Sequence, residues 1–501
     1  MDFGEIRLPR TEYSAEELEE EIKNGKESGF FSKIIADYQE NVRKTQEANR
    51  YFINITDIIY ESMNENKHKK IDAAVKNAVT NPLRNADNKE AHGFYQILVN
   101  QKISYLFSKK ILLTSKNKKF NTYLKELSNR IFEVISELAL YSSNGGRSWA
   151  YPYIDLEGNF KLAAMESTTI IPFYDSTIEK NLKYLLRIYD KTIELISVDG
   201  IYYYDKDKKG QYQKRFDEKG QPIIEYNYYK IKNKITGKEK KGKTWGKFPI
   251  IEFANNVVKT RDLDMVKLFV DAYDKIVSLY LNDIDDLQQL IFVLINYGGQ
   301  NLEEFLNDLR QYKAVKVTKT GAGSDGGVET LKVDIPVDAR IKLLDIIEEN
   351  IWRLGQGVNP KKESIGDASG VALKHLYGLL ELKAGLMEVQ FRNAINKVIE
   401  IYKIYLKETG KGDYIKEEVD QIYTKTMITN DSEIIEDCVK SMSVLSLKTV
   451  IANHPYIDNV EEELKQIEEE RAKKEEQYPF PTANNDVDEE SKKAGEVDES
   501  K

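Results

Sequence analysis

The sequence has very little of the chemistry that disulfides, metal centres and membrane spans require. Its 501 residues include one cysteine, Cys438, and four histidines. A single cysteine excludes an internal disulfide, and so few histidines leave little for a metal centre. No run of about 18 uncharged apolar residues occurs, which excludes a membrane-spanning helix. The N-terminal stretch carries acids where a secretory signal carries bases and an apolar segment, so we expect a protein kept in a cytoplasm.

Motifs for catalysis and nucleotide binding are also missing. The sequence contains no GxxxxGK[ST] phosphate loop, no HExxH and no GxSxG. The Gly-rich stretch GAGSDGG at 321–327 lacks the lysine and the following helix of a phosphate loop, so we interpret it as a hairpin tip. Asp283, Asp285 and Asp286 end a predicted helix without an oxygen-rich loop around them. We therefore predict no enzymatic activity, no metal and no cofactor.

The main part of the chain has almost no net charge. The formal net charge is −9, but residues 461–501 hold 15 acidic and 7 basic residues, which leaves 68 acidic and 67 basic residues in the first 460. A protein that grips duplex DNA usually presents a basic face. The near-neutral body excludes such a grip. From about Pro479 the sequence loses large apolar residues, which predicts a disordered acidic tail.

The apolar residues that are present predict an α+β, mainly helical fold with several cores. The chain is longer than the roughly 250–300 residues at which single cores stop growing. Apolar residues repeat every three or four positions over residues 12–65 and 90–142, as in amphipathic helices. Short β-branched and aromatic runs separated by turn residues fill the stretch from Trp149 to Phe253. We expect the tyrosines of these strands to be half-buried structural residues rather than a platform for stacking bases.

Three long helices follow the β-rich part. Apolar stripes predict the first over Asp262–Asp286, the second from Pro336 to Gly355, and the third from Gly370 to about Lys407. A small αβ module separates the first two helices, and the loop Val358–Ser369 separates the second from the third. A short strand and three further helices are predicted beyond Gly410-Lys411-Gly412.

This order of elements resembles the portal proteins of tailed double-stranded-DNA bacteriophages, most closely those of long-tailed phages of Gram-positive hosts. The resemblance covers roughly residues 90–475 in colinear order. It is carried by the stretches WGKFPIIEFANN, DDLQQLIFVLINYGG, GGVETLKVDIPVDA, ALKHLYGLLELKAGLME, TGKGDY, ITNDSEIIEDCV and NHPYIDNVEEELKQIEEE.

The resemblance implies a function as well as a fold. Portal proteins form a ring, usually a homododecamer, at one capsid vertex of the virion. Through the ring the terminase motor packages double-stranded DNA, which is later ejected. Implied partners are the terminase, the major capsid and scaffolding proteins, and head-completion or connector proteins, with no membrane and with assembly in the host bacterial cytoplasm. The alternative is a non-enzymatic cytoplasmic scaffold or adaptor built from long helices.

The resemblance also implies a division of the chain. In portal terms the parts are a wing (1–256, helical and then β-rich from about 149), a first stem helix (257–286), a clip (287–335), a second stem helix (336–355), a tunnel loop (356–369), a long wing helix (370–408), a crown (409–478) and a disordered acidic tail (479–501).

Three sets of candidate functional residues follow from this division. A ring repeats each side chain about a dozen times. A tunnel loop in which acidic residues offset the basic ones therefore lets DNA slide, whereas a basic loop would bind the DNA tightly. The candidate DNA-channel residues are Asn359, Lys361, Lys362, Glu363, Ser364 and Asp367, of which the two lysines are expected to touch phosphate transiently. The candidate hinges are Gly355, Gly357, Gly366 and Gly370. The candidate subunit-interface residues of the stem are Val266, Phe269, Tyr273, Ile276, Tyr280, Leu344, Ile347 and Ile351.

Overall fold

The computed structural model describes most of the chain and divides it into two compact units. The described residues are 12–71, 86–155, 157–218, 220–221, 224–225, 244–287, 291–295, 327–331, 336–359, 370–426, 431–457 and 460–477. The first unit comprises residues 1–362 and 375–427, and the second comprises residues 363–374 and 428–501.

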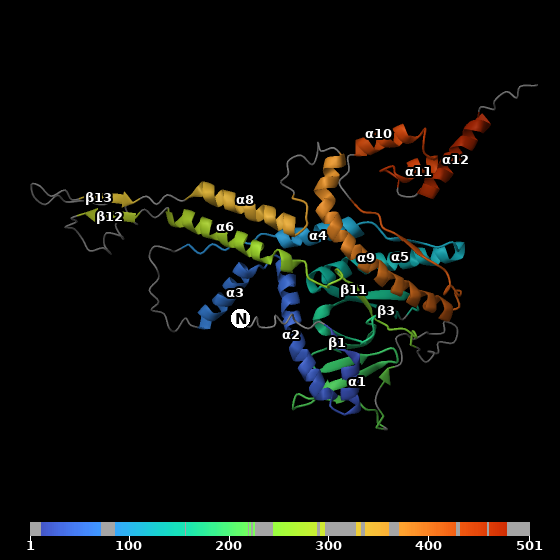
Figure 1. Cartoon of the computed structure of the whole chain (residues 1–501), viewed down its shortest axis with the longest axis horizontal. Coiled ribbons are helices and arrows are strands. Elements are labelled where there is room, and N and C mark those ends of the chain that lie inside the picture. The colour runs from blue at the N-terminus through green and yellow to red at the C-terminus, as the bar shows by residue number, and fades with distance from the viewer. Residues whose placement is uncertain are drawn as a thin grey trace, which may run out of the picture. The chain divides into compact units, whose positions relative to one another are not determined.

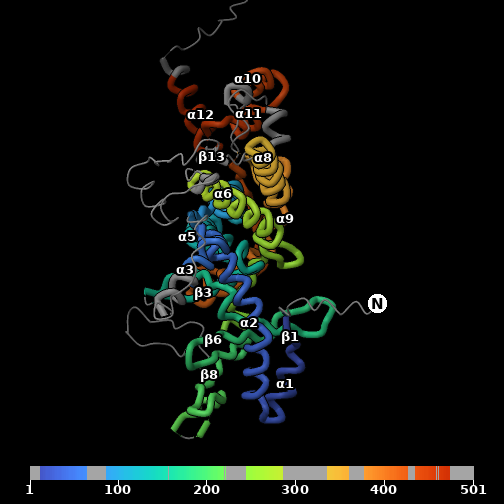
Figure 2. Tube along the Cα trace, turned by 90° about the vertical axis from the view of Figure 1, so that its left-hand side faces the viewer, coloured from blue at the N-terminus to red at the C-terminus, as the bar shows by residue number. Residues whose placement is uncertain are grey.

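The N-terminal part of the first unit is helical, as its periodicity predicts. Its elements are β1 (Tyr13–Ser14), α1 (Ala15–Lys23), α2 (Glu27–Phe52) and α3 (Asp57–Ile71). The Ser14 hydroxyl begins α1 because it accepts a hydrogen bond from the backbone N–H of Glu17, which has no partner within the helix. Phe31, Ile34 and Tyr38 bury one side of α2. This side packs against the larger β-sheet (Figure 2).

The β-rich part forms two sheets. Its strands are β3 (Arg147–Ile154), β4 (Phe160–Glu166), β5 (Ile170–Tyr174), β6 (Leu182–Ile188), β7 (Thr192–Ile196), β8 (Ile201–Lys206), β9 (Tyr212–Lys214), β10 (Ile224–Glu225) and β11 (Ile251–Ala254). The seven-stranded sheet has the order β1-β5-β6-β7-β8-β10, with β9 also paired to β8, and the three-stranded sheet has the order β11-β3-β4. Only β1 and β5 run parallel among these pairs. Tyr202 and Tyr203 are partly buried strand residues, as predicted, whereas Tyr174, Tyr204 and Tyr212 are fully buried.

The largest core lies between the three-stranded sheet and three helices. These helices are α4 (Phe94–Phe107), α5 (Lys118–Gly145) and α9 (Gly370–Glu408). The sequence predicts a strand over IYTKTMI at 422–428, but the structure places the short β14 at Asp420–Ile422, where it pairs with β2 (Leu112–Thr114), and residues 423–426 are not in a strand. This pairing places residues 409–426, predicted to lie in the crown, in the first unit.

The two stem helices predicted from the sequence are present. They are α6 (Lys267–Leu287) and α8 (Val337–Leu354), which lie side by side (Figure 1). The first begins later than predicted, because Leu263–Met265 forms a separate 3₁₀ turn. β12 (Ile291–Ile295) pairs antiparallel with β13 (Gly327–Leu331). The hairpin tip is predicted at 321–327, but Gly327 begins β13 and pairs with Ile295 of β12, and residues 321–326 lie outside the described residues.

The second unit contains helices. They are α10 (Asp431–Ser441), α11 (Leu447–Ala452) and α12 (Val460–Gln477). Ser446 caps α11 by accepting a hydrogen bond from the Thr449 backbone N–H, and the buried Cys438 lies against the carbonyl of Val450. The predicted tail, 479–501, lies outside the described residues. Among the helices that the structure describes, none has the length and apolar character needed to cross a membrane.

Candidate functional site: the stem and its junction with the body

The stem, defined here as α6 and α8, is an antiparallel helix pair. Near the end of α6, Asp283 accepts a hydrogen bond from Arg340, which lies near the start of α8, at 2.5 Å. At the opposite end, Val266, which directly precedes α6, and Val270 of α6 share one buried cluster with Ile351 of α8. We call the remainder of the first unit the body. The two stem helices are joined by apolar packing at the end nearest the body and by an ion pair near their other end.

Most predicted interface residues of the stem face the chain itself. Val266 and Ile351 are 0% exposed, and Ile347 is also buried. The other five, Phe269, Tyr273, Ile276, Tyr280 and Leu344, are partly buried. The stem also exposes apolar side chains outside the predicted interface set: Leu268, Leu279, Leu343 and Ile346. Periodicity marks the most apolar stripe of a helix, and here the contacts within the subunit use that stripe.

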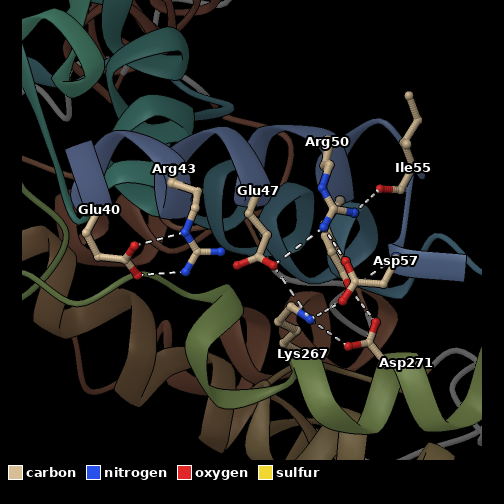
Figure 3. A network of polar contacts seen from close by, with 9 residues as sticks. Glu40, Arg43, Glu47, Arg50, Ile55, Asp57, Lys267 and Asp271 are labelled. Carbon is tan, nitrogen blue, oxygen red and sulfur yellow. Dashed lines mark hydrogen bonds and ion pairs between the residues drawn. The ribbon is translucent and has the colours of Figure 1, made fainter. Parts of the chain in front are cut away.

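A network of charged side chains joins the start of the stem to the α2–α3 corner (Figure 3). Lys267 on α6 lies 2.5 Å from Asp57, 2.8 Å from Asp271 and 3.6 Å from Glu47. Arg50 on α2 also pairs with Asp57. Burial alone would raise the pKa of Asp57, but hydrogen bonds from Lys267 and Arg50 lower it. The carboxylate is therefore held in its charged form between two helices.

Further along α6, an extended segment over residues 88–92 binds to its polar side. Three side chains of α6, spaced four residues apart and therefore on one side of the helix, accept hydrogen bonds from backbone N–H groups of this segment. The pairs are Asp274 with His92 (3.0 Å), Ser278 with Glu90 (2.9 Å) and Asn282 with Asn88 (2.6 Å). The fully buried Asp274 also accepts a hydrogen bond from the Thr56 hydroxyl at 2.7 Å and contacts the His92 ring at 2.9 Å. The sequence shows the polar spacing but not the segment that covers it.

A buried polar cluster lies where the first stem helix leaves the body. Lys102 of α4 lies 2.5 Å from Asp262, and Lys383 of α9 lies 3.3 Å from the same carboxylate. Asn255 donates a hydrogen bond to Asp262 at 2.8 Å. Burial alone would raise the pKa of Asp262, but the two lysine charges and the hydrogen bonds lower it to about 2. Lys383 also donates to the carbonyl of Gly355 at 2.9 Å, so the cluster connects both stem helices to α9.

The structure describes only part of the predicted tunnel loop. Asn359 is partly buried, Gly355 and Gly357 lie directly after α8, and Gly370 begins α9. The remaining candidates, Lys361, Lys362, Glu363, Ser364, Gly366 and Asp367, lie outside the described residues. The DNA-contact and hinge assignments therefore stay predictions.

Two of the three acidic residues that the sequence places at the end of α6, Asp283 and Asp285, have hydrogen-bonding partners in the chain. Asp283 pairs with Arg340, and Asp285 accepts a hydrogen bond from the side chain of Asn88 at 2.6 Å. Within the described ranges, no group of three or more histidine, cysteine, aspartate or glutamate side chains is placed to hold a metal ion. Ion pairs, hydrogen bonds and apolar packing in this region thus connect the stem helices to the body.

Known proteins match this chain over most of its length. The family model of the phage portal protein, SPP1 Gp6-like, matches residues 32–477. A portal protein of Clostridium phage phiCD119 is 35% identical over 429 residues, covering 81% of this chain and 90% of the relative. A portal protein of Bacillus phage SPP1 is 34% identical over 400 residues, covering 77% of this chain and 76% of the relative. A chain from the virion of a native gene transfer agent particle aligns over 74% of this chain and 88% of its own length, at 9% identity and a TM-score of 0.39, a likeness too weak to support an argument.

These matches define the class of the protein as a phage portal protein, the genome channel at a capsid vertex. Within that class, the chain belongs to the SPP1 Gp6-like family. The resemblance seen in the sequence, the α+β fold and the portal function are thereby confirmed. The protein is a structural component of the virion that assembles with the capsid and other phage proteins.

Proposed function

We propose that this portal protein acts as a ring of twelve subunits in the phage particle, whose stem surrounds the passing DNA. The terminase packages the genome through the ring, and connector proteins later assemble on it. The ring has no catalytic activity of its own and assembles in the host bacterial cytoplasm. The observation that carries this proposal is the family match together with the paired stem helices, which leave apolar side chains exposed on each helix.

The exposed apolar residues of the stem support a specific ring contact. Leu268, which is 80% exposed, and Leu279 lie eleven residues apart and thus on one side of α6. Leu343 and Ile346, which is 57% exposed, are neighbours on one side of α8. A ring joins two different patches of each subunit, since every contact is head-to-tail. The α6 patch of one subunit therefore packs on the α8 patch of the next.

Cysteine cross-linking tests this contact directly. The chain has one cysteine, the buried Cys438, so a Cys438→Ser background contains no competing thiol. Leu279→Cys combined with Leu343→Cys should give, on oxidation, a ladder of covalent oligomers that ends at the ring. The control pairs Leu279→Cys with Ile178→Cys, at a fully exposed loop position. A monomer at micromolar concentration by mass photometry, with no ladder, would favour the scaffold alternative and overturn the ring.

The DNA contact is a separate part of the proposal. Lys361 and Lys362 are balanced by Glu363 and Asp367 in the loop, so the lysines touch phosphate only transiently and the DNA keeps sliding. The double variant Lys361→Ala, Lys362→Ala should change the packaging rate or the packaged DNA length, with ring assembly unaffected. Unchanged values of both quantities would refute the contact.

A further inference from the structure

The chain between the second stem helix and residue 359 is fastened to α4. The side-chain amide of Gln101 donates to the carbonyl of Val358 at 2.8 Å and accepts from the backbone N–H of Val358 at 2.9 Å. One side chain thus replaces both backbone partners that a neighbouring strand would supply. Val358 itself is buried in the main core, so its backbone groups have no access to water as an alternative partner.

The end of α8 is held by a cap that continues into this contact. Gln356 has a left-handed φ of +54°, as the residue after a helix end often has. The capping hydrogen bonds run from the N–H of Gly355 to Ile351 (2.9 Å), from Gln356 to Arg353 (3.3 Å) and from Gly357 to Trp352 (3.0 Å). Together with Val358, four consecutive N–H groups are bonded. A change of backbone dihedrals here would break several of these bonds.

The two glycines of this segment pack against Leu98, which lies three residues before Gln101 on α4. A Cβ on Gly355 would come within 2.5 Å of a Leu98 methyl group, and a Cβ on Gly357 within 2.3 Å of the other. Neither glycine has a positive φ, so neither is required for a left-handed turn. Close packing gives a sufficient reason for glycine at both positions.

We propose that Gln101 and Leu98 are positioning residues that fix the point at which the chain leaves the stem toward residues 360–369. Lys383 supports the same anchor from α9 through its hydrogen bond to the Gly355 carbonyl. Gly355 and Gly357 serve close packing and are not hinges. The functional meaning of the anchor rests on the proposed ring: every subunit then presents its loop from the same position.

The test compares Gln101→Met with Gln96→Met. The first variant keeps the side-chain length but removes both hydrogen bonds, and the second makes the same change at an exposed position of the same helix. Hydrogen exchange at residues 355–358 should be slow in the parent chain and about tenfold faster in Gln101→Met, the effect expected of losing two hydrogen bonds. Ring yield by mass photometry should stay unchanged, while packaged DNA should fall severalfold. Gln96→Met should match the parent in all three.

The proposal is overturned by fast exchange at residues 355–358 in the parent chain, or by a Gln101→Met variant that packages DNA normally. A parallel loss of ring yield and packaging would also overturn it, since that is the signature of a merely structural residue. Failure of the parent chain to form rings would refute the proposed function instead, and hydrogen exchange would still test the anchor in the monomer.

A second measurement separates packing from hinge motion at Gly357. Gly357→Ala should lower stability because its methyl group meets Leu98, and Leu98→Ala should relieve that clash. Because Leu98→Ala also removes a buried side chain, the double variant is compared with Leu98→Ala alone, and it should be no less stable and should package DNA equally well. A double variant that is less stable and packages less DNA than Leu98→Ala would show that Gly357 is needed for its backbone freedom.

Discussion

At the scale of single residues, Gly146 decides how the body joins the stem. It follows α5 with a φ of +78°, and a Cβ on it would lie 2.1 Å from the carbonyl oxygen of Lys259. Its own carbonyl accepts a hydrogen bond from the N–H of Asn255 at 2.9 Å. The glycine therefore allows the end of α5 to touch the segment that leads into the stem.

Gly146→Ala should destabilise the first unit by about 3 kcal/mol or more, because left-handed strain of about 1–2 kcal/mol adds to a backbone clash. The matched control is Gly158→Ala, which has a φ of +87° but open space around it and should cost only the strain. Urea unfolding followed by tryptophan fluorescence measures both, since Trp149, Trp245 and Trp352 all lie in this unit. Equal losses for the two variants would contradict the clash.

Asp262 should give the protein a specific sensitivity to acid. Its pKa of about 2 lies below the ordinary value of 3.8, so the folded state binds fewer protons than the unfolded state between these values. The stabilisation is therefore complete above about pH 4 and is lost as the pH falls toward 2. A shift of this size corresponds to about 2 kcal/mol.

The measurement is the difference in unfolding free energy between the parent chain and Asp262→Asn at pH 7 and at pH 3. The difference should shrink at the lower pH. Asp37→Asn serves as the control, because Asp37 is an exposed residue of α2. A difference that does not change with pH would show that Asp262 gains nothing from its two lysines.

At the scale of elements, the first stem helix is bound to the body along its length. Lys267 near its start, Asp274 in its middle and Asn282 near its end each bond to residues that precede position 93. The second stem helix packs on the first, and near its end Trp352 also contacts the ring of Phe94 on α4. We infer that α6 moves with the N-terminal part of the chain as one body.

Asp274→Ala should release the segment 88–92 from α6. The substitution removes three hydrogen bonds from a fully buried carboxylate and leaves their donors without partners, at a cost of about 3 kcal/mol. Hydrogen exchange in residues 88–92 should accelerate, whereas Lys275→Ala, an exposed neighbour on α6, should change neither exchange nor stability. Unchanged protection of the segment in Asp274→Ala would contradict this anchoring role.

The sequence predicts the bounds of helices more accurately than it predicts which strands pair with each other. The stripe from Gly370 to Lys407 predicts α9 within one residue of its end, because helical periodicity is a property of neighbouring positions. The pairing of β14 with β2 joins residues about 300 positions apart, and no local pattern encodes it. The 3₁₀ turn before α6 was missed because its apolar spacing continues that of the helix.

At the scale of the whole molecule, ring formation should depend on exposed stem residues. Leu343→Asp places a charge in the proposed contact but leaves the interior of the subunit untouched, so rings should be replaced by monomers with an unchanged unfolding midpoint. Ile178→Asp, at an exposed loop position outside the stem, should leave the rings intact. Mass photometry distinguishes these outcomes, and intact rings in Leu343→Asp would exclude this face from the contact.

The sequence by itself determined the helix pattern, the near-neutral body, the lack of catalytic motifs and the portal resemblance. All of these are carried by neighbouring residues or by their order. Only the tertiary structure decided which apolar stem residues stay exposed, which lysines surround Asp262, and which side chain holds Val358. Gln101 and Val358 are 257 positions apart, and their contact depends on how α4 packs against the end of α8. Such contacts arise from the packing of whole elements, so they have no signature in local sequence.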